Sequence, residues 1–166
     1  MIIRTTNMWN AIDIDLMLVT TNGYIAGYKT PTQHLVMGRG AALESTIKYK
    51  DIAKIAASTI ISDGYPKIDR KQPLFLYGMI QLPIAPYDAV YNNYIGLFQV
   101  KYYWGDKASL SLIGYSLTKL FIWMQQNPDK VVGLNFPGIG YGGLHRENII
   151  PMLEEFGDKL IVFEKE

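Results

Sequence analysis

The pattern of apolar and polar residues predicts two kinds of element in this chain. Short runs of consecutive or alternating apolar residues indicate strands, whereas apolar residues at three- and four-residue spacing indicate helices. Strands are expected at 2–5, 11–19, 74–84, 93–103, 131–136 and 160–163, and helices at 41–61, 110–124 and 145–156. The polar segment 24–33, which contains glycine and proline, is expected to form an exposed hairpin or loop.

Strands that alternate with helices in this order predict an α/β fold, a three-layer α/β/α sandwich with a mixed central sheet. No linker, repeat or low-complexity segment interrupts the chain, so residues 1–166 are expected to form a single domain. Ligands of such sheets bind beyond the carboxyl ends of the strands. Asn22, the segment after Lys101 and two glycine-rich loops all follow strands, and we expect them to meet at that edge.

Composition narrows the possible functions. Apolar residues make up 49% of the chain and charged residues 19%, as in an ordinary globular protein. The formal net charge of +1 argues against generic nucleic-acid binding and against binding to an acidic membrane. The absence of cysteine excludes disulfides, thiolate catalysis and cysteine-ligated zinc. Neither a bilayer-spanning apolar stretch nor a signal-peptide pattern is present, so a cytoplasmic location is expected.

The two glycine-rich loops, 36–42 and 137–143, each lie between a predicted strand and a predicted helix. Glycine lets backbone N–H groups approach an anion closely, and a helix that begins after the loop adds the positive end of its dipole. Together the loops suggest one cleft for a diphosphate-containing ligand. Each loop also has a purely structural explanation, the second as a tight turn and the first as a close contact between helix and sheet.

The second loop also satisfies the dinucleotide-binding pattern G-x-G-x-x-G over residues 138–143, with Glu164 about 20 residues further on. A dinucleotide-binding fold needs several strands after this loop, and only a short tail remains. We therefore reject that interpretation. A Walker loop is excluded as well, because no Gly-Lys-Ser/Thr sequence occurs.

Two further polar features have competing explanations. Asn22 precedes Gly23, and an Asn-Gly pair is typical of an ordinary turn. Alternatively, the side-chain amide of Asn22 hydrogen-bonds a ribose hydroxyl. Asp13 and Asp15 share one face of a predicted strand. A polar strand edge is favoured over a metal pair there, because no further carboxylate or histidine has ligand spacing nearby.

The remaining candidates are basic residues. His34 and His145 are too few and too far apart to predict a zinc site. His145 follows the second glycine loop at a predicted helix start, where it is either a polar first-turn residue or a general acid or base. Lys101 either lies on the outward face of a strand, or pairs with a phosphate or attacks an anomeric carbon. Arg39 is either a phosphate ligand or a solvated loop residue.

Four segments, in order along the chain, resemble the macrodomains, a family that binds ADP-ribose and its derivatives. Residues 19–23 are similar to the family's strand that ends in a ribose-contacting asparagine, and 36–42 to its first phosphate loop, of the M-G-K/R-G-x-A type. Residues 98–107 are similar to the F-P-T-K-x-x-W-x-x-K segment of one branch, and 137–144 to the second loop. That branch contains the ADP-ribosyl-glutamate and DNA ADP-ribose glycohydrolases.

The resemblance implies roles for particular residues. The lysine that matches Lys101 is implicated in catalysis through a covalent sugar adduct, and His145 or Glu147 would act with it as acid or base. Neither a metal nor another cofactor is implied. The implied ligand-binding residues are Asn22, Gly23, Met37, Gly38, Arg39, Gly40, Ala41, Pro137, Gly138, Ile139, Gly140, Tyr141, Gly142 and Gly143.

Three departures from the family pattern bear on ligand choice. Asn7-Met8-Trp9 replaces the family's Gly-Asp-hydrophobic sequence, whose aspartate reads adenine. Gly143-Leu144-His145 stands where some catalytic members have an aspartate, and the insertion 24–35 lengthens the first loop. The expected function is binding of ADP-ribose, free or on protein or nucleic acid, with hydrolysis of an ADP-ribosyl linkage. A non-catalytic reader or scavenger and an ADP-ribose-1''-phosphate phosphatase are the alternatives.

Overall fold

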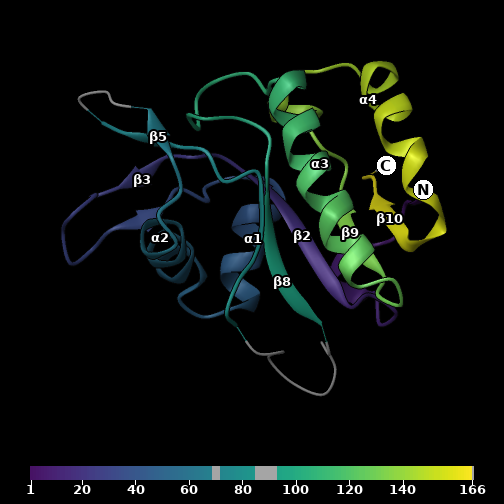
Figure 1. The fold of residues 1–166 in the computed structure, drawn as a ribbon, viewed down its shortest axis with the longest axis horizontal. Helices are drawn as coiled ribbons and strands as arrows, with labels where there is room; N and C mark the ends of the chain where they lie inside the picture. Colours follow the sequence, from purple (N-terminus) through teal and green to yellow (C-terminus); the bar gives the residue numbers. More distant parts are fainter. Residues whose placement is uncertain (69–71, 85–92, 166) are drawn as a thin grey trace.

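A six-stranded mixed sheet forms the centre of the computed structural model, which describes residues 1–68, 72–84 and 93–165 (Figure 1). In spatial order its strands are β1 (Ile2–Arg4), β10 (Leu160–Phe163), β9 (Val132–Asn135), β2 (Leu16–Thr21), β8 (Tyr94–Gln99) and β7 (Met79–Gln81). All neighbouring strands run parallel except β7, which is antiparallel to β8. The carboxyl ends of five parallel strands therefore lie along one edge.

Helices cover both faces of this sheet, as the sequence predicts for a three-layer sandwich (Figure 1). The helices are α1 (Gly40–Lys48), α2 (Ile52–Ser62), α3 (Leu110–Gln126) and α4 (Arg146–Leu153). Successive side chains of β2 point to opposite faces: Met17 belongs to the core under α1 and α2, and Leu18 to the core under α3 and α4. Burial on both faces explains why the central strands are almost continuously apolar.

The smaller elements surround this sandwich. Two short antiparallel pairs, β3 (Ile25–Ala26) with β4 (His34–Leu35) and β5 (Lys67–Ile68) with β6 (Leu74–Phe75), lie outside the main sheet. The first pair frames the hairpin or loop expected over 24–33, but Ile25 and Leu35 of its strands are buried, not exposed as predicted. Three 3₁₀ segments complete the description: η1 (Met8–Asn10), η2 (Gly140–Gly142) and η3 (Glu154–Lys159).

The strand expected at 11–19 is shorter than predicted, because β2 begins at Leu16. Arg4 donates two hydrogen bonds to the carboxylate of Asp13, at 2.8 and 2.6 Å. The carboxylate of Asp15 accepts a hydrogen bond from the Val131 N–H at 2.8 Å. Both acidic side chains thus hold the entrance to the sheet together, in line with the polar-edge interpretation.

Three other predicted elements differ from the observed ones, two of them because a left-handed residue interrupts the backbone. The helix expected at 41–61 is divided into α1 and α2, because Asp51 adopts a left-handed conformation with φ +60°. The strand expected at 74–84 is divided into β6 and β7 by Gly78, whose φ is +72°. The helix expected at 145–156 ends at Leu153 and continues as η3. Its Pro151 lies in the second turn, not in the first as the sequence suggests.

Candidate functional site

A cavity of about 970 Å³ opens where the parallel strands end. Segments from all five of them line it: residues 5–8 after β1, 20–22 at the end of β2, 100–101 after β8, 135–136 at the end of β9 and 163–165 at the end of β10. The first glycine loop, with the beginning of α1, and the second glycine loop form the remaining walls. The sheet edge predicted to collect the unusual residues is therefore the edge that is hollowed.

The first glycine loop places the N-terminus of α1 at the cavity. Gly40 begins the helix with φ +57°, and no side chain caps its first turn. The N–H groups of that turn have no partner within the helix, and the helix dipole adds positive potential around them. A Cβ added at Gly38 or Gly40 would have no heavy atom within 4 Å. This wall is thus an open backbone surface suited to an anion.

The second loop is held by its own backbone. Leu144 N–H donates to the Gly138 carbonyl at 2.9 Å, and Gly143 N–H donates to the Gly140 carbonyl at 3.0 Å. Gly138 and Gly140 have φ of +80° and +63°, which disfavour any other residue. A Cβ at Gly138 would also lie 2.9 Å from Ile113 Cδ1. Gly138 is therefore needed for packing, whereas Gly140 has open space beside it.

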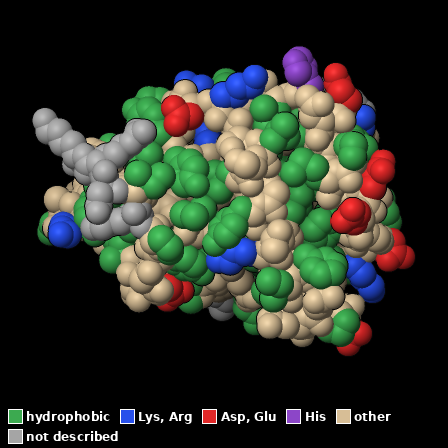
Figure 2. Space-filling model, turned by 45° about the horizontal axis from the view of Figure 1, so that its top comes forward, with side chains coloured by type: hydrophobic (Ala, Val, Ile, Leu, Met, Phe, Trp, Pro, Cys, Tyr) green, Lys and Arg blue, Asp and Glu red, His purple; other side chains and the backbone are tan. Residues whose placement is uncertain are grey.

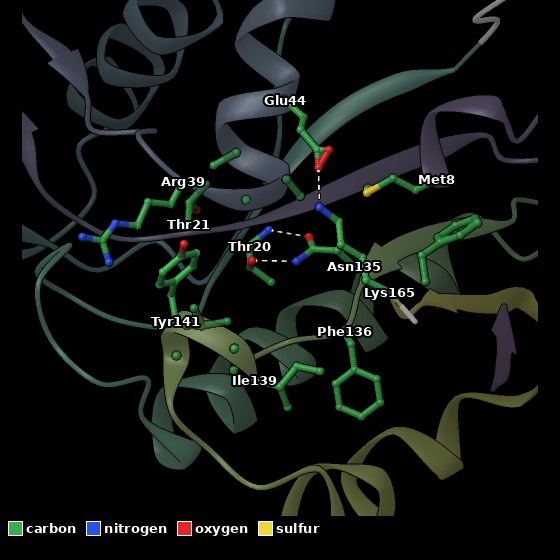
Figure 3. Close-up of a pocket in the computed structure, with 18 of the residues that line it drawn as sticks. Met8, Thr20, Thr21, Arg39, Glu44, Asn135, Phe136, Ile139, Tyr141 and Lys165 are labelled. Atoms are coloured by element: carbon green, nitrogen blue, oxygen red, sulfur yellow. Dashed lines mark hydrogen bonds and ion pairs between the residues drawn. The ribbon is translucent and has the colours of Figure 1, made fainter. Parts of the chain in front are cut away.

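Arg39 and Tyr141 join the two loops at one end of the cavity (Figure 3). The Arg39 guanidinium carbon lies 4.7 Å from the centre of the Tyr141 ring, a cation–π distance. Both side chains are exposed, and Tyr141 retains 71% of its accessible surface. The contact therefore crosses the mouth of the cavity and does not fill its floor.

Asn22 lines the cavity but uses most of its side chain to hold the first loop. Its Nδ2 donates to the Val36 carbonyl at 2.8 Å, and its Oδ1 accepts from the Tyr24 N–H at 2.8 Å. One N–H of the amide is left for a ligand. Gly23 lies outside the lining, and a Cβ there would clash with the Phe75 carbonyl oxygen. Both explanations of the Asn-Gly sequence, turn and ligand contact, thus have a geometric basis.

Asn135 is a lining residue that the sequence analysis missed. Its Oδ1 accepts from the Thr20 N–H at 2.9 Å, and its Nδ2 donates to Thr20 Oγ1 at 2.8 Å (Figure 3). These bonds join the carboxyl ends of β9 and β2 at the cavity floor. The sequence did carry a signal for Asn135. It is a single polar residue near the end of an apolar strand, shortly before the second glycine loop.

Lys101 lies in the wall formed after β8. Its Nζ donates to the Asp106 carbonyl at 3.1 Å. Partial burial lowers the pKa of Lys101, and the positive charge of Arg39 lowers it further, while Asp106 acts in the opposite direction. A lowered pKa makes the neutral, nucleophilic amine more accessible at moderate pH.

Gln99, two residues before Lys101, is a second residue that the sequence analysis missed. It is fully buried, and its Oε1 accepts from the Tyr77 and Gly78 N–H groups at 2.9 and 3.0 Å. Its Nε2 donates to the carbonyls of Phe75 and Lys101 at 2.8 and 3.3 Å. This single amide therefore ties the backbone of Lys101 to the segment between β6 and β7.

The end of the cavity away from Arg39 carries a different set of groups. Met8 of η1 and Glu44 of α1 line it together with Lys165, which follows β10 (Figure 3). Lys165 Nζ lies 3.1 Å from Glu44 Oε1, and the buried Trp9 donates its Nε1–H to Glu44 Oε2 at 3.3 Å. The sequence analysis did not single out Glu44 or Lys165.

The other predicted ligand-binding residues divide into two sets. The cavity lining includes Met37, Gly38, Arg39, Gly40, Ala41, Gly138, Ile139, Gly140, Tyr141 and Gly142. It does not include Pro137 or Gly143. His145 is exposed at the N-cap position of α4 and is also outside the lining, as is Glu147 in the first turn of that helix.

The described residues give little support to other site types. Within them, no three His, Asp or Glu side chains gather closely enough to hold a metal ion. No helix in the described part of the chain is long and apolar enough to cross a membrane. On the face in Figure 2, Lys and Arg side chains are dispersed among Asp and Glu, without one basic patch.

Comparison with known proteins identifies the fold. No family model matches the sequence, and no curated protein matches it in a sequence search. Among solved structures, the macrodomain of Mycobacterium tuberculosis DarG aligns with a TM-score of 0.66 and 19% identity, covering 100% of this chain and 98% of that one. The macrodomain of Thermus aquaticus DarG gives 0.68 and 21%, covering 99% and 97%. Thermosipho africanus DarTG in complex with ADP-ribose gives 0.64 and 15%, covering 92% of this chain and 38% of that one. The chain therefore has the macrodomain fold, as the four ordered segments of its sequence predict.

Proposed function

We propose that this protein binds ADP-ribose. The observation that carries the proposal is the cavity itself, where two glycine loops and the N-terminus of α1 face one another at the sheet edge. Backbone N–H groups in such positions bind phosphate oxygens. The likeness to a DarTG structure that holds ADP-ribose supports a diphosphate linked to two riboses as the ligand.

The diphosphate would lie between the two loops, which places the two ends of the ligand at opposite ends of the cavity. The distal ribose would lie toward Lys101 and Arg39, with Asn22 in reach through its remaining amide N–H. The adenosine would lie toward Met8 and Glu44, where the lining combines apolar side chains with a carboxylate.

The second part of the proposal is hydrolysis of an ADP-ribosyl linkage on protein or nucleic acid. The neutral amine of Lys101 would attack the anomeric carbon, forming a C–N bond while the bond to the acceptor breaks. The acceptor would take a proton, and water would then release ADP-ribose and restore the amine. The lowered pKa of Lys101 supports this role. His145 and Glu147 lie outside the cavity lining, so neither lines the space in which the acceptor would leave.

Calorimetry with ADP-ribose tests binding, with AMP as a ligand that lacks the distal half. We expect ADP-ribose to bind more tightly than AMP, and a Gly38→Glu variant, at a position with open space around the added side chain, to bind neither. An absence of binding heat for the wild-type protein at millimolar ADP-ribose would refute the proposal.

Turnover is tested separately with ADP-ribosylated protein and ADP-ribosylated oligonucleotide, by measuring released ADP-ribose. We expect Lys101→Ala to lose turnover and retain affinity for ADP-ribose, because the loops that hold the diphosphate are unchanged. A wild-type protein that binds but releases nothing would instead be a reader or scavenger. Release of inorganic phosphate from ADP-ribose-1''-phosphate would indicate a phosphatase.

A further inference from the structure

The side of α3 that faces away from the sheet is exposed and largely apolar. α3 lies on one face of the sheet with α4 beside it, and its inner side chains are buried in the core beneath it (Figure 1). On the outer side Tyr115, Phe121 and Ile122 keep 42%, 48% and 50% of their accessible surface. The outer face of α3 comprises residues that recur at helical spacing: Ser111, Gly114, Tyr115, Thr118, Phe121, Ile122 and Gln125.

This outer face carries no charge. Lys119 is the single charged residue among the 17 residues of α3. Its Nζ donates to the Tyr77 carbonyl at 2.6 Å and lies 4.6 Å from the centre of the Tyr65 ring. Lys119 projects about 160° away from Phe121 around the helix axis. A helix face in contact with water normally carries charged side chains, so this face has the composition of an interface core.

Gly114 lies in the middle of the outer face, and the fold does not require a glycine there. Its φ is not positive. Among the described residues, an added Cβ would meet only Met152 Cε, at an ordinary contact distance of 3.6 Å. Glycine inside a helix is less stable than alanine. The missing side chain is explained if another protein surface packs closely against α3 at this position.

The outer face is complementary to a second copy of itself. When two copies of α3 cross antiparallel at Thr118, residues equally far from Thr118 on either side meet across the contact. Ile122 of each copy then faces the gap at Gly114 of the other, and Tyr115 faces Phe121. A large side chain thus fits a small one, and the aromatic rings pair, twice over. A two-fold symmetric interface requires this self-complementarity.

The charges at the two ends of α3 also suit an antiparallel pair. Asp106 and Lys107 precede the helix, Asp129 and Lys130 follow it, and all four are exposed. An antiparallel contact brings the beginning of one helix beside the end of the other. Each end then presents both signs of charge to its counterpart, and the two helix dipoles oppose each other favourably. A strongly acidic or basic partner would find no such match.

We propose that the outer face of α3 is the interface of a two-fold symmetric homodimer, in which two copies of α3 pack antiparallel around Thr118. The contact is about 25 Å long, the length of 17 helical residues. Interfaces of this size fall near or below the ~1,200 Å² of total buried area that marks weak complexes. The dimer should therefore dissociate in the micromolar range. It leaves the cavity at the strand ends as a separate site.

Analytical ultracentrifugation tests the association, from low micromolar to millimolar protein. We expect the average mass of the wild-type protein to rise from that of one chain to that of two. Ile122→Lys places a charge in the contact and should raise the dissociation constant at least about tenfold. Ile47→Lys is the matched control, since Ile47 is 79% exposed on α1, and should leave the dissociation constant unchanged.

Gly114→Ala distinguishes a lost interface from a damaged fold. Alanine favours the helix, so the variant should have an unchanged or higher unfolding temperature at dilutions where the protein is monomeric. Filling the gap that receives Ile122 should nevertheless weaken the dimer at least about tenfold.

Cysteine cross-linking tests the antiparallel arrangement, because the natural chain contains no cysteine. A short bis-maleimide, which spans the about 8–10 Å between packed helices, should join two copies of Thr118→Cys. Ser111→Cys should not join to itself, since the two positions would lie about 21 Å apart, but should join to Gln125→Cys.

Three results would overturn the proposal. One is wild-type protein that stays monomeric over the whole concentration range. The second is a dimer that Ile122→Lys and Gly114→Ala leave intact, which would place the interface elsewhere. The third is self-cross-linking of Ser111→Cys as efficient as that of Thr118→Cys, which the antiparallel packing excludes.

Discussion

Replacement of Gly38 by alanine separates the glycines that the fold requires from those that a ligand requires. Gly38 lines the cavity, its φ lies outside the positive range, and an added Cβ would have no heavy atom within 4 Å. Nothing in the protein therefore requires glycine at this position. Its missing side chain is explained if a ligand occupies that space.

Gly38→Ala should weaken ligand binding without lowering the stability of the fold. Gly38→Ala should leave the free energy of unfolding unchanged or raise it by about 0.5 kcal/mol, because alanine restricts the unfolded chain. A methyl group in the phosphate cradle should weaken ADP-ribose binding at least about tenfold, or ~1.4 kcal/mol. That loss is within the ~1–3 kcal/mol cost of overpacking a fitted surface.

Two other glycines serve as controls for the backbone and for packing. Gly64 also has open space around its Cβ position, but its φ is +69° and it lies outside the cavity. Gly64→Ala should lose about 1–2 kcal/mol of stability and no affinity. Gly138→Ala should lose more stability, because its φ is +80° and Ile113 Cδ1 would lie 2.9 Å from the new Cβ.

Urea denaturation and calorimetry with ADP-ribose provide the two measurements. Wild-type affinity in Gly38→Ala would refute the argument that the first loop touches the ligand. A loss of stability above about 1 kcal/mol in that variant would refute the claim that the fold has no need of glycine there. A loss of affinity in Gly64→Ala would show that general destabilisation accounts for weaker binding.

Three further predictions follow from buried and charged groups. Gln99→Leu removes the amide that hydrogen-bonds two backbone N–H groups and two carbonyls. The free energy of unfolding, measured with urea, should fall by about 2–4 kcal/mol. A loss below about 1 kcal/mol would contradict this. The hydrogen bonds from Arg4 lower the pKa of Asp13 in the folded protein. The pair therefore stabilises the fold fully above the pKa that Asp13 has in the unfolded chain. This stabilisation is lost as the pH falls through the lowered pKa of the folded state. Asp13→Asn should therefore cost about 0.5 kcal/mol at neutral pH and nothing in acid, a difference that equal losses at both pH values would contradict. Because Arg39 lowers the pKa of Lys101, Arg39→Gln should move the rising limb of the pH–rate profile for hydrolysis to higher pH, and an unmoved limb would exclude this coupling.

The strongest sequence patterns predicted the fold well. The apolar runs that became β9 and β10 and the periodic run that became α3 lie within a few residues of the observed elements. The side chains of β9 and β10 and one face of α3 are buried in the core, so local pattern and tertiary packing agree there. Two of the errors occur where the backbone turns between predicted apolar positions. At Asp51 and Gly78 the apolar residues continue on both sides of a left-handed residue, and periodicity carries no record of that turn.

The parts of the candidate site that the sequence predicts are those with a recognisable pattern of neighbouring residues in the chain. The glycine loops, Asn22 and Lys101 follow strands in the sequence, and parallel topology brings such positions together. Glu44 and Lys165 are 121 residues apart, and each has the sequence context of an ordinary solvated charge. The sheet order β10-β9-β2, with α1 packed against β2, brings them to the same edge. Long-range pairs of this kind leave no local signal.

The amide side chains around the cavity limit what a single substitution can prove. Asn22 holds the first glycine loop through Val36, Asn135 joins two strand ends through Thr20, and Gln99 holds the backbone of Lys101. Removal of any of them would move a wall of the cavity, so weaker binding in an Asn22→Ala variant would not establish contact with a ribose. We expect the ligand to be held mainly by the backbone N–H groups of the loops and by a few charged side chains. Substitutions that add volume at Gly38 therefore report on the ligand more directly than deletion of the conspicuous asparagine.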